Sequence, residues 1–372
     1  MTVTIGRGGS AAGVVTPAAA RAEFATKVTY LDTATMGLPP RRSWLALQQA
    51  LAEWQAGTAD AVGYDRPLAE ARRSYARLVG VPPSAVAVGS QVSVFAGLIA
   101  ANLPAGSEVL TATGDFTSIL FPFLAQAGRG VTVREVPLER ICDSVTPGTT
   151  LVAVSAVQSA DGRVIDLDTL HAATESTGTR VLLDTTQAVG WLPVDASRFA
   201  YTACGGYKWL LSPRGTAYFT LRPELIGDLI PHTAGWYAGD SPWTSIYGGP
   251  LRLAADARRF DVSPAWHAWV AAGPAVGLLA QVGARPLHTH ALGLANRFRA
   301  GAGLEPGNSA IVSLATDDGT AAAMATARIA GSARAGRLRL SFHISTSEAD
   351  VDHAIDTLRP HILPSDRPPR RR

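Results

Sequence analysis

The sequence has 372 residues, of which 47% are hydrophobic and 17% charged, and its formal net charge is +3. This composition is typical of a globular protein that is long enough for one large and one small domain. The basic residues form no patch that would favour a nucleic-acid partner, and no apolar run reaches the roughly 20 residues that cross a bilayer.

Cysteine and histidine usage argues against a metal centre. Cys142 and Cys204 are the only cysteines, too few for a disulfide framework or a four-cysteine zinc site. His288 and His290 have the spacing of a ligand pair, but no acidic or thiol partner lies near them in sequence. No bound metal is therefore expected.

The two ends of the chain are expected to lie outside the folded domains. Residues 1–17 lack the compact apolar region of a secretory signal, so the cytoplasm is the expected location. We expect residues 1–27 to form a flexible N-terminal extension. Residues 364–372 are rich in arginine and are expected to form a basic, disordered tail.

The first two thirds of the chain change from helical spacing to an alternation of strands and helices. Helices are predicted over residues 18–27, 43–56, 67–78, 94–102, 121–126 and 167–176. Strands are predicted over residues 86–88, 108–111, 131–136, 150–155, 180–184, 201–203 and 216–220. Short strands alternating with helices predict a mostly parallel sheet covered on both faces.

The pattern changes near Gly248. A long helix is predicted over residues 265–282, followed by strands over 311–315 and 337–342 and a last helix over 347–358. We therefore expect a large domain over residues 28–245 and a small C-terminal α+β domain over residues 246–363.

An acid and a lysine stand out as candidate site residues. Asp184 ends an apolar strand, where sites of parallel sheets lie. Lys208 stands among glycines and aromatic residues in Gly205-Gly206-Tyr207-Lys208-Trp209. A lysine in an apolar site has a lowered pKa and attacks aldehydes. Taken singly, the acid could be structural and the lysine could be a surface residue beside an aromatic ring.

A third feature suggests a phosphate site. The run from Gly89 to Ser93 precedes a predicted helix, whose N-terminal N–H groups favour an anion; alone it could be an ordinary helix start. Together, the acid, the lysine and this run supply what a pyridoxal site needs. These are a partner for the ring nitrogen, an amine for the aldehyde and a phosphate cradle.

Over residues 28–362 the sequence resembles fold-type I pyridoxal 5′-phosphate (PLP) enzymes of aminotransferase class V. This group includes cysteine desulfurases, kynureninases, isopenicillin N epimerase-like proteins and the C–S lyase of ergothioneine synthesis. The matching positions are Asp184 and Gln187 of the family's Asp-x-x-Gln, Lys208, Gly215, Arg258-Arg259-Phe260 and Arg339. The resemblance implies an α/β fold, with a mostly parallel seven-stranded large domain and a small α+β domain.

The resemblance also implies roles for individual residues. Lys208 would hold PLP as a Schiff base, Asp184 would bind the pyridine nitrogen and Gln187 the phenolic oxygen. The other implied cofactor contacts are Gln91, Val92, Ser93, Phe116, Ser159, Tyr207 and Trp236. The implied substrate contacts are Arg339, for the α-carboxylate, with Tyr30, Thr35, Met36 and His343. The pair Gly235-Trp236 resembles one that reaches the neighbouring subunit's phosphate in kynureninases, which implies a homodimer with shared sites.

The expected substrate is a small amino acid. Two departures from the pattern of cysteine desulfurases narrow the range of reactions expected on it. Phe116 stands where desulfurases carry a histidine, so acid–base work falls mainly to Lys208. No cysteine follows Cys204, so a persulfide-forming desulfurase is not expected. We expect C–S cleavage by β-elimination, or decarboxylating oxidative deamination, of a cysteine S-conjugate in bacterial specialised metabolism such as antibiotic biosynthesis. An aminotransferase or epimerase, a kynureninase-like hydrolase and a non-catalytic pyridoxal-binding protein remain as alternatives.

Overall fold

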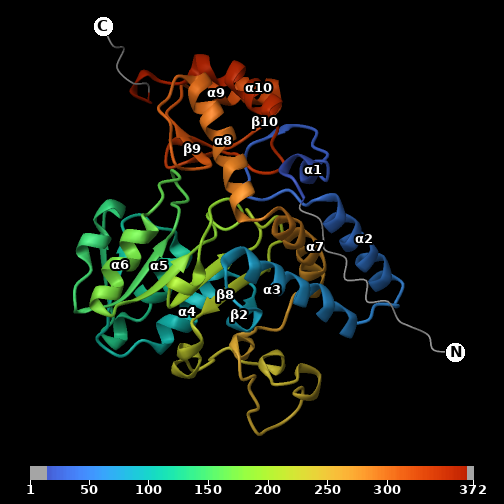
Figure 1. Cartoon of the computed structure of the whole chain (residues 1–372), viewed down its shortest axis with the longest axis vertical. Helices are drawn as coiled ribbons and strands as arrows, with labels where there is room; N and C mark the ends of the chain where they lie inside the picture. Colours follow the sequence, from blue (N-terminus) through green and yellow to red (C-terminus); the bar gives the residue numbers. More distant parts are fainter. Residues whose placement is uncertain (1–14, 367–372) are drawn as a thin grey trace, which may run out of the picture.

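The computed structural model describes residues 15–366, built around one seven-stranded sheet (Figure 1). Its strands, in spatial order, are β2 (Val86–Gly89), β8 (Ala217–Leu221), β7 (Tyr201–Gly205), β6 (Arg180–Asp184), β5 (Thr149–Ser155), β3 (Glu108–Ala112) and β4 (Thr132–Val136). Only β8 runs antiparallel to its neighbours. The mostly parallel sheet expected from the sequence is thus confirmed.

Helices cover both faces of this sheet. One face packs against α3 (Asp65–Val79), α6 (Leu167–Thr177) and α7 (Trp266–Val282). The other packs against α4 (Val92–Asn102) and α5 (Thr117–Leu124). Because successive side chains of a strand point to opposite faces, most residues of the central strands are buried, whereas the edge strand β4 has none that is buried.

A smaller layer lies beyond one end of the large sheet, at the top of Figure 1. Its antiparallel sheet has the order β11 (Ser332–Arg334), β12 (Arg337–Ser341) and β9 (Ile311–Leu314). The helices of this layer are α8 (Ala284–Ala302), α9 (Thr320–Ala327) and α10 (Glu348–Leu358). A two-stranded parallel sheet joins β1 (Thr29–Tyr30) to β10 (Ile329–Ala330), so the start of the chain completes this layer.

The small layer begins later than residue 246. The short helix η10 (Ala257–Phe260) packs on β2, and α7 packs on α3 and on α2 (Arg41–Gln55). By its contacts, residues 246–282 therefore belong with the large sheet, because α7 buries its apolar surface there. The helix α8 was not foreseen, since glycine and histidine interrupt its apolar pattern.

The ends differ in part from expectation. Part of the expected extension contacts the fold: α1 (Pro17–Arg21) lies against α7 and α8, and Ala20 is buried. Asp366 of the expected tail pairs with Arg337 at 2.6 Å. The rest of both segments, residues 1–14 and 367–372, lies outside the described residues. Within residues 15–366, no helix has both the length and the apolarity needed to cross a membrane.

A buried ion pair ties η10 to the large sheet. The Arg72 guanidinium on α3 donates to both oxygens of Asp261, at 3.1 and 2.6 Å, and to the carbonyl of Val86. Asp261 also accepts from the backbone N–H of Val88 at 2.8 Å. Two of these four hydrogen bonds are made by the backbone of β2, the strand that leads to α4.

Candidate active site

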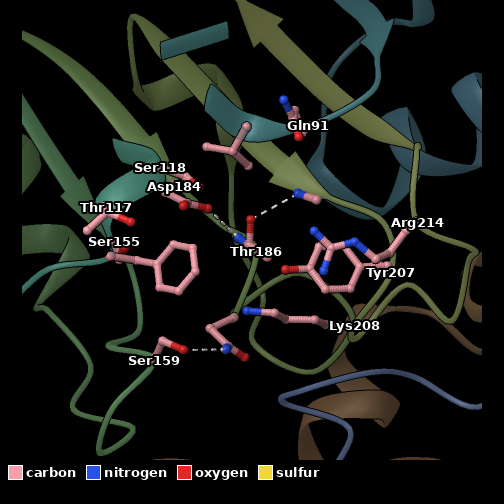
Figure 2. A pocket seen from close by; sticks show the side chains of 14 residues that line it. Gln91, Thr117, Ser118, Ser155, Ser159, Asp184, Thr186, Tyr207, Lys208 and Arg214 are labelled. Atoms are coloured by element: carbon pink, nitrogen blue, oxygen red, sulfur yellow. Dashed lines mark hydrogen bonds between the residues drawn. The ribbon is translucent and has the colours of Figure 1, made fainter. Parts of the chain in front are cut away.

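A cavity of about 230 Å³ lies at the carboxyl ends of the parallel strands (Figure 2). Its wall includes β6 and β7 and the first turns of α4 and α5. The residues that line it are Gln91, Val92, Phe116, Thr117, Ser118, Ser155, Ser159, Asp184, Thr186, Gln187, Gly205, Tyr207, Lys208 and Arg214. Most of the cofactor contacts predicted from sequence therefore meet in one place.

Lys208 projects into this cavity from the turn after β7 (Figure 2). Its side chain is 6% exposed, and Nζ lies 5.3 Å from the ring centre of Phe116 and 5.5 Å from that of Tyr207. Burial lowers the pKa of Lys208 to about 8, against the opposing effect of Asp184. The amine is therefore neutral, and nucleophilic, at a much lower pH than an exposed lysine.

The turn leaves little freedom around this lysine. A Cβ added at Gly206 would lie 2.4 Å from the hydroxyl of Thr216, so only glycine fits there. The chain holds just two lysines, Lys27 and Lys208. Lys208 is thus the only amine side chain among the residues that line the cavity.

Asp184 occupies the end of β6, at the floor of the cavity. Its carboxylate accepts from the backbone N–H of Thr186 at 2.8 Å. Burial, and to a lesser degree the nearby charge of Asp115, raises the pKa of Asp184 to about 6. A buried carboxylate of this kind is stabilised by a positively charged N–H, which a protonated pyridine ring offers.

Gln187 is fixed by three hydrogen bonds. Its amide nitrogen donates to the carbonyl of Ala34 and to the hydroxyl of Ser159, each at 3.0 Å. Its oxygen accepts from the indole N–H of Trp209 at 2.7 Å. The side chain is therefore held in one orientation at the cavity wall, one turn after Asp184.

The part of the cavity wall where helices begin suits a phosphate group. The helices α4 and α5 both begin there, at Val92 and Thr117, and helix N-termini favour anions. The guanidinium of Arg214 lies 4.7 Å from the ring centre of Tyr207 and also lines the cavity. Together with Phe116 as a stacking surface, these residues fit PLP: amine, ring-nitrogen partner, ring face and phosphate cradle are all present.

Arg339 lies behind Ser159 and does not line the cavity. The side chain is 1% exposed, and burial lowers its pKa to about 10. Its Nη1 donates to the carbonyl and the hydroxyl of Ser159, and its Nη2 donates to Thr35 Oγ1 at 2.7 Å. Contact with a substrate carboxylate requires an exchange of these hydrogen bonds.

Several predicted site residues lie outside the cavity. They are Ser93, in the first turn of α4, with Tyr30, Thr35, Met36, Trp236 and His343. His343 is fully buried, with Nε2 2.9 Å from the carbonyl oxygen of Trp209, and burial lowers its pKa to about 3. It is a packing residue here, and its expected substrate contact has no support. Trp236 packs against Tyr237 and Trp243 instead.

Sequence reasoning missed Thr186, Arg214 and a buried carboxylate, Asp115. Asp115 accepts from the backbone N–H of Ser155 at 2.8 Å and from Gln158 at 3.3 Å, and so joins two neighbouring strand ends. Thr186 and Arg214 both lie within the runs that were singled out, one beside Gln187 and the other after Lys208. Their nearness to those residues is the signal that could have found them.

The fold and the cavity define a PLP-dependent enzyme, and comparison with known proteins agrees. Residues 30–302 match the model of the aminotransferase class-V family. The uncharacterized aminotransferase YcbU of Bacillus subtilis is 26% identical over 310 residues, 77% of this chain and 82% of the relative. Isopenicillin N epimerase of Streptomyces clavuligerus is 26% identical over 283 residues, 69% of this chain and 70% of the relative.

Solved structures confirm the fold. The cystine C–S lyase C-DES superposes with a TM-score of 0.80 at 21% identity, over 91% of this chain and 99% of that one. The Escherichia coli cysteine desulfurase CsdA gives 0.78 at 19% identity, over 92% and 98%. The chain belongs to the aminotransferase class V family. It has the fold-type I architecture, its cofactor is PLP, and it acts on amino acids.

The pKa of Lys208 gives a testable pH dependence. The rate at which the cofactor-free protein takes up PLP covalently should rise about tenfold per pH unit below the pKa of about 8 and level off above it. Only the neutral amine attacks the aldehyde, and an exposed lysine would remain mostly protonated up to about pH 10.4. Absorbance after mixing with PLP measures the rate. A rate that keeps rising steeply above pH 9 would contradict the buried setting of this amine.

Proposed function

We propose that this enzyme cleaves the C–S bond of a cysteine S-conjugate by β-elimination. The conjugate and water would yield a free thiol, pyruvate and ammonium. The observation that carries the proposal is the content of the cavity. It holds Lys208, whose pKa is lowered to about 8, and no cysteine lines it. PLP, when bound, supplies an electron sink that stabilises negative charge at the substrate Cα.

The side chains of the cavity have distinct roles in this proposal. Lys208 removes the proton from Cα, because its pKa of about 8 suits a base near neutral pH. Phe116 cannot transfer a proton, so it serves as an apolar surface beside Lys208 Nζ. Asp184 keeps the ring nitrogen protonated. Arg339 binds the α-carboxylate after exchanging its bonds to Ser159 and Thr35.

Neither thiol is suited to accept sulfur. Cys204 is buried beneath the cavity floor with its Sγ 3.6 Å from the carbonyl oxygen of Thr185, and burial raises its pKa to about 12. Cys142 lies in a different depression, beside Leu138 and Asp166, and burial also raises its pKa. A thiol must ionise and be reachable to attack sulfur. We therefore infer that the enzyme does not form a persulfide, although two archaeal relatives are named probable cysteine desulfurases.

Other outcomes on the same residues are the second candidates. Relatives named as an aminotransferase and as isopenicillin N epimerase favour transamination or epimerisation. Decarboxylating oxidative deamination and kynureninase-like hydrolysis use the same lysine and acid. The epimerase relative also supports a role in bacterial specialised metabolism, such as antibiotic assembly, for which the cytoplasm is the proposed location.

We also infer a homodimer with shared active sites. Trp236 does not line the cavity of its own chain, which leaves it available to the neighbouring subunit's phosphate site. The helix α2 exposes four large apolar side chains, Trp44, Leu45, Leu51 and Trp54. Apolar side chains grouped in this way typically mark a surface that a partner covers.

The discriminating experiment is incubation of the holoenzyme with a panel of cysteine S-conjugates. We expect pyruvate, ammonium and thiol in equal amounts, without CO2 or peroxide. CO2 with oxygen uptake would identify oxidative decarboxylation instead, and turnover that depends on a keto acid would identify an aminotransferase. Racemised substrate alone would identify an epimerase, and anthranilate from kynurenine a hydrolase. L-Cysteine serves as the control: sulfur retained on the protein as a persulfide would overturn the exclusion of desulfurase chemistry.

A further inference from the structure

Two arginines of one hairpin converge on a single hydroxyl. Arg334 ends β11 and Arg339 lies in β12, the next strand. Arg339 Nη2 donates to Thr35 Oγ1 at 2.7 Å, and Arg334 Nη2 donates to the same oxygen at 3.1 Å. Because both Nη2 atoms donate to the same oxygen, the distance between them cannot exceed the sum of these two hydrogen-bond lengths.

This pair has little negative charge to offset it. Among residues 15–366, Arg339 pairs only with the carboxylate of Asp32, whose Oδ1 lies 3.8 Å from Arg339 Nη2 and has no hydrogen-bond partner. Arg334 makes no ion pair with any residue of the same part of the chain. By contrast, Arg337 of the same hairpin pairs with Asp366 at 2.6 Å. A neutral hydroxyl thus accepts from two cations that repel each other, in a place where an anion would bind both.

The pair is connected to the cofactor cavity by a chain of hydrogen bonds. Gln187 donates to Ser159 Oγ at 3.0 Å, Arg339 donates to the same oxygen at 3.2 Å, and Arg339 and Arg334 share Thr35. Along this chain the side chains pass from buried Gln187 and Arg339 to exposed Arg334. The positive charges of Arg339 and Arg334 both contribute to lowering the pKa of Lys208, which agrees with their nearness to the cavity.

The hairpin holds Arg334 in place. Arg334 pairs directly with Arg337, so the turn contains two residues, Ala335 at φ 48° and Gly336 at φ 75°. Positive φ at both positions is the geometry of tight two-residue hairpin turns. The backbone that carries Arg334 is therefore fixed, and its guanidinium is positioned by the hydrogen bond to Thr35.

We propose that Arg334 binds a second acidic group, carried on the side chain of the substrate. Buried Arg339 would take the α-carboxylate, and the substrate side chain would extend outward toward exposed Arg334. The preferred substrates are then amino acids with a carboxylate or a similar anion at the far end of the side chain. That the substrate is a cysteine conjugate rests on the proposed function. That its side chain ends in an acidic group rests on the position of Arg334 alone.

The test compares two ligands that differ in charge but not in size, S-(2-carboxyethyl)-L-cysteine and S-(2-carbamoylethyl)-L-cysteine. Binding to the holoenzyme is followed by the change in cofactor absorbance. We expect the acid to bind about tenfold or more tightly than the amide, as a charge-assisted hydrogen bond predicts. In Arg334→Gln the preference for the acid over the amide should fall to within about twofold. Added salt should weaken the wild-type preference, because Arg334 is exposed.

Arg337→Gln is the matched control, because it removes an arginine of the same hairpin whose partner is Asp366. It should keep the preference for the acid. L-Glutamate and L-glutamine repeat the comparison without a sulfur atom. Equal affinity of wild type for acid and amide in both pairs, or a preference that survives in Arg334→Gln, would overturn the inference. A wrong proposed function would give a different result: the cysteine conjugates would bind, but no pyruvate would be released.

Discussion

Replacement of Lys208 by alanine is expected to reduce turnover by about a thousandfold or more and to abolish covalent attachment of PLP. The side chain supplies both the amine for the aldehyde and the base for the Cα proton. Asp184 and Gln187 keep their hydrogen bonds to Thr186, Ala34 and Trp209. The variant should therefore still bind PLP, but reversibly.

Borohydride reduction followed by mass measurement distinguishes these states. The reduced wild-type chain should retain the mass of the cofactor, and the reduced Lys208→Ala chain should lose it on unfolding. Lys27→Ala is the natural control, because Lys27 is the only other lysine and lies outside the cavity. Retention of the cofactor's mass by Lys208→Ala, or its loss from Lys27→Ala, would refute the assignment.

Asp261→Asn is expected to lower the free energy of unfolding by about 3–5 kcal/mol. The change preserves side-chain volume but leaves the charge of Arg72 buried without a counter-charge. It also weakens the bond that the carboxylate accepts from Val88. Both effects act on β2, which leads directly into the start of α4 at the cavity.

An exposed pair of similar geometry provides the control. Arg297 donates to both oxygens of Asp352, at 2.7 and 2.8 Å, but both side chains are partly exposed to solvent. Asp352→Asn should cost about 1 kcal/mol or less. Denaturant unfolding of the holoenzymes measures both values. Equal losses in the two variants would mean that burial does not determine the contribution of the Arg72–Asp261 pair.

The large domain and the centre of the site were predictable because their signals are local. Strands of a covered parallel sheet are short apolar runs between helices, and Asp184 ends one such run. Lys208 was recognisable because a lysine between glycines and aromatic residues is unusual on a surface. Each of these two signals lies within a run of about ten residues. It can therefore be read from the sequence without knowing which distant segments meet in the fold.

The remainder depends on contacts between distant segments. Thr35 meets Arg334 and Arg339 only because the start of the chain lies along the small layer, and no local pattern reveals that. His343 was a reasonable candidate because it follows Arg339 by four residues. The strand β12 ends at Ser341, however, so the alternation of its side chains does not extend to His343, which turns into the core.

The pairing of β1 with β10 has a consequence for the order in which the protein is built. All seven strands of the large sheet have left the ribosome once Leu221 has emerged, so that sheet can form during synthesis. Thr29 cannot pair until Ile329 has been made, and Leu31 receives the backbone N–H of Ser341. The same early segment donates from Gly37 to the carbonyl of Tyr207, beside Lys208. The segment that packs against the turn carrying Lys208 is therefore encoded near the beginning of the message, but its pairing with the small layer forms only after Ile329 has been made.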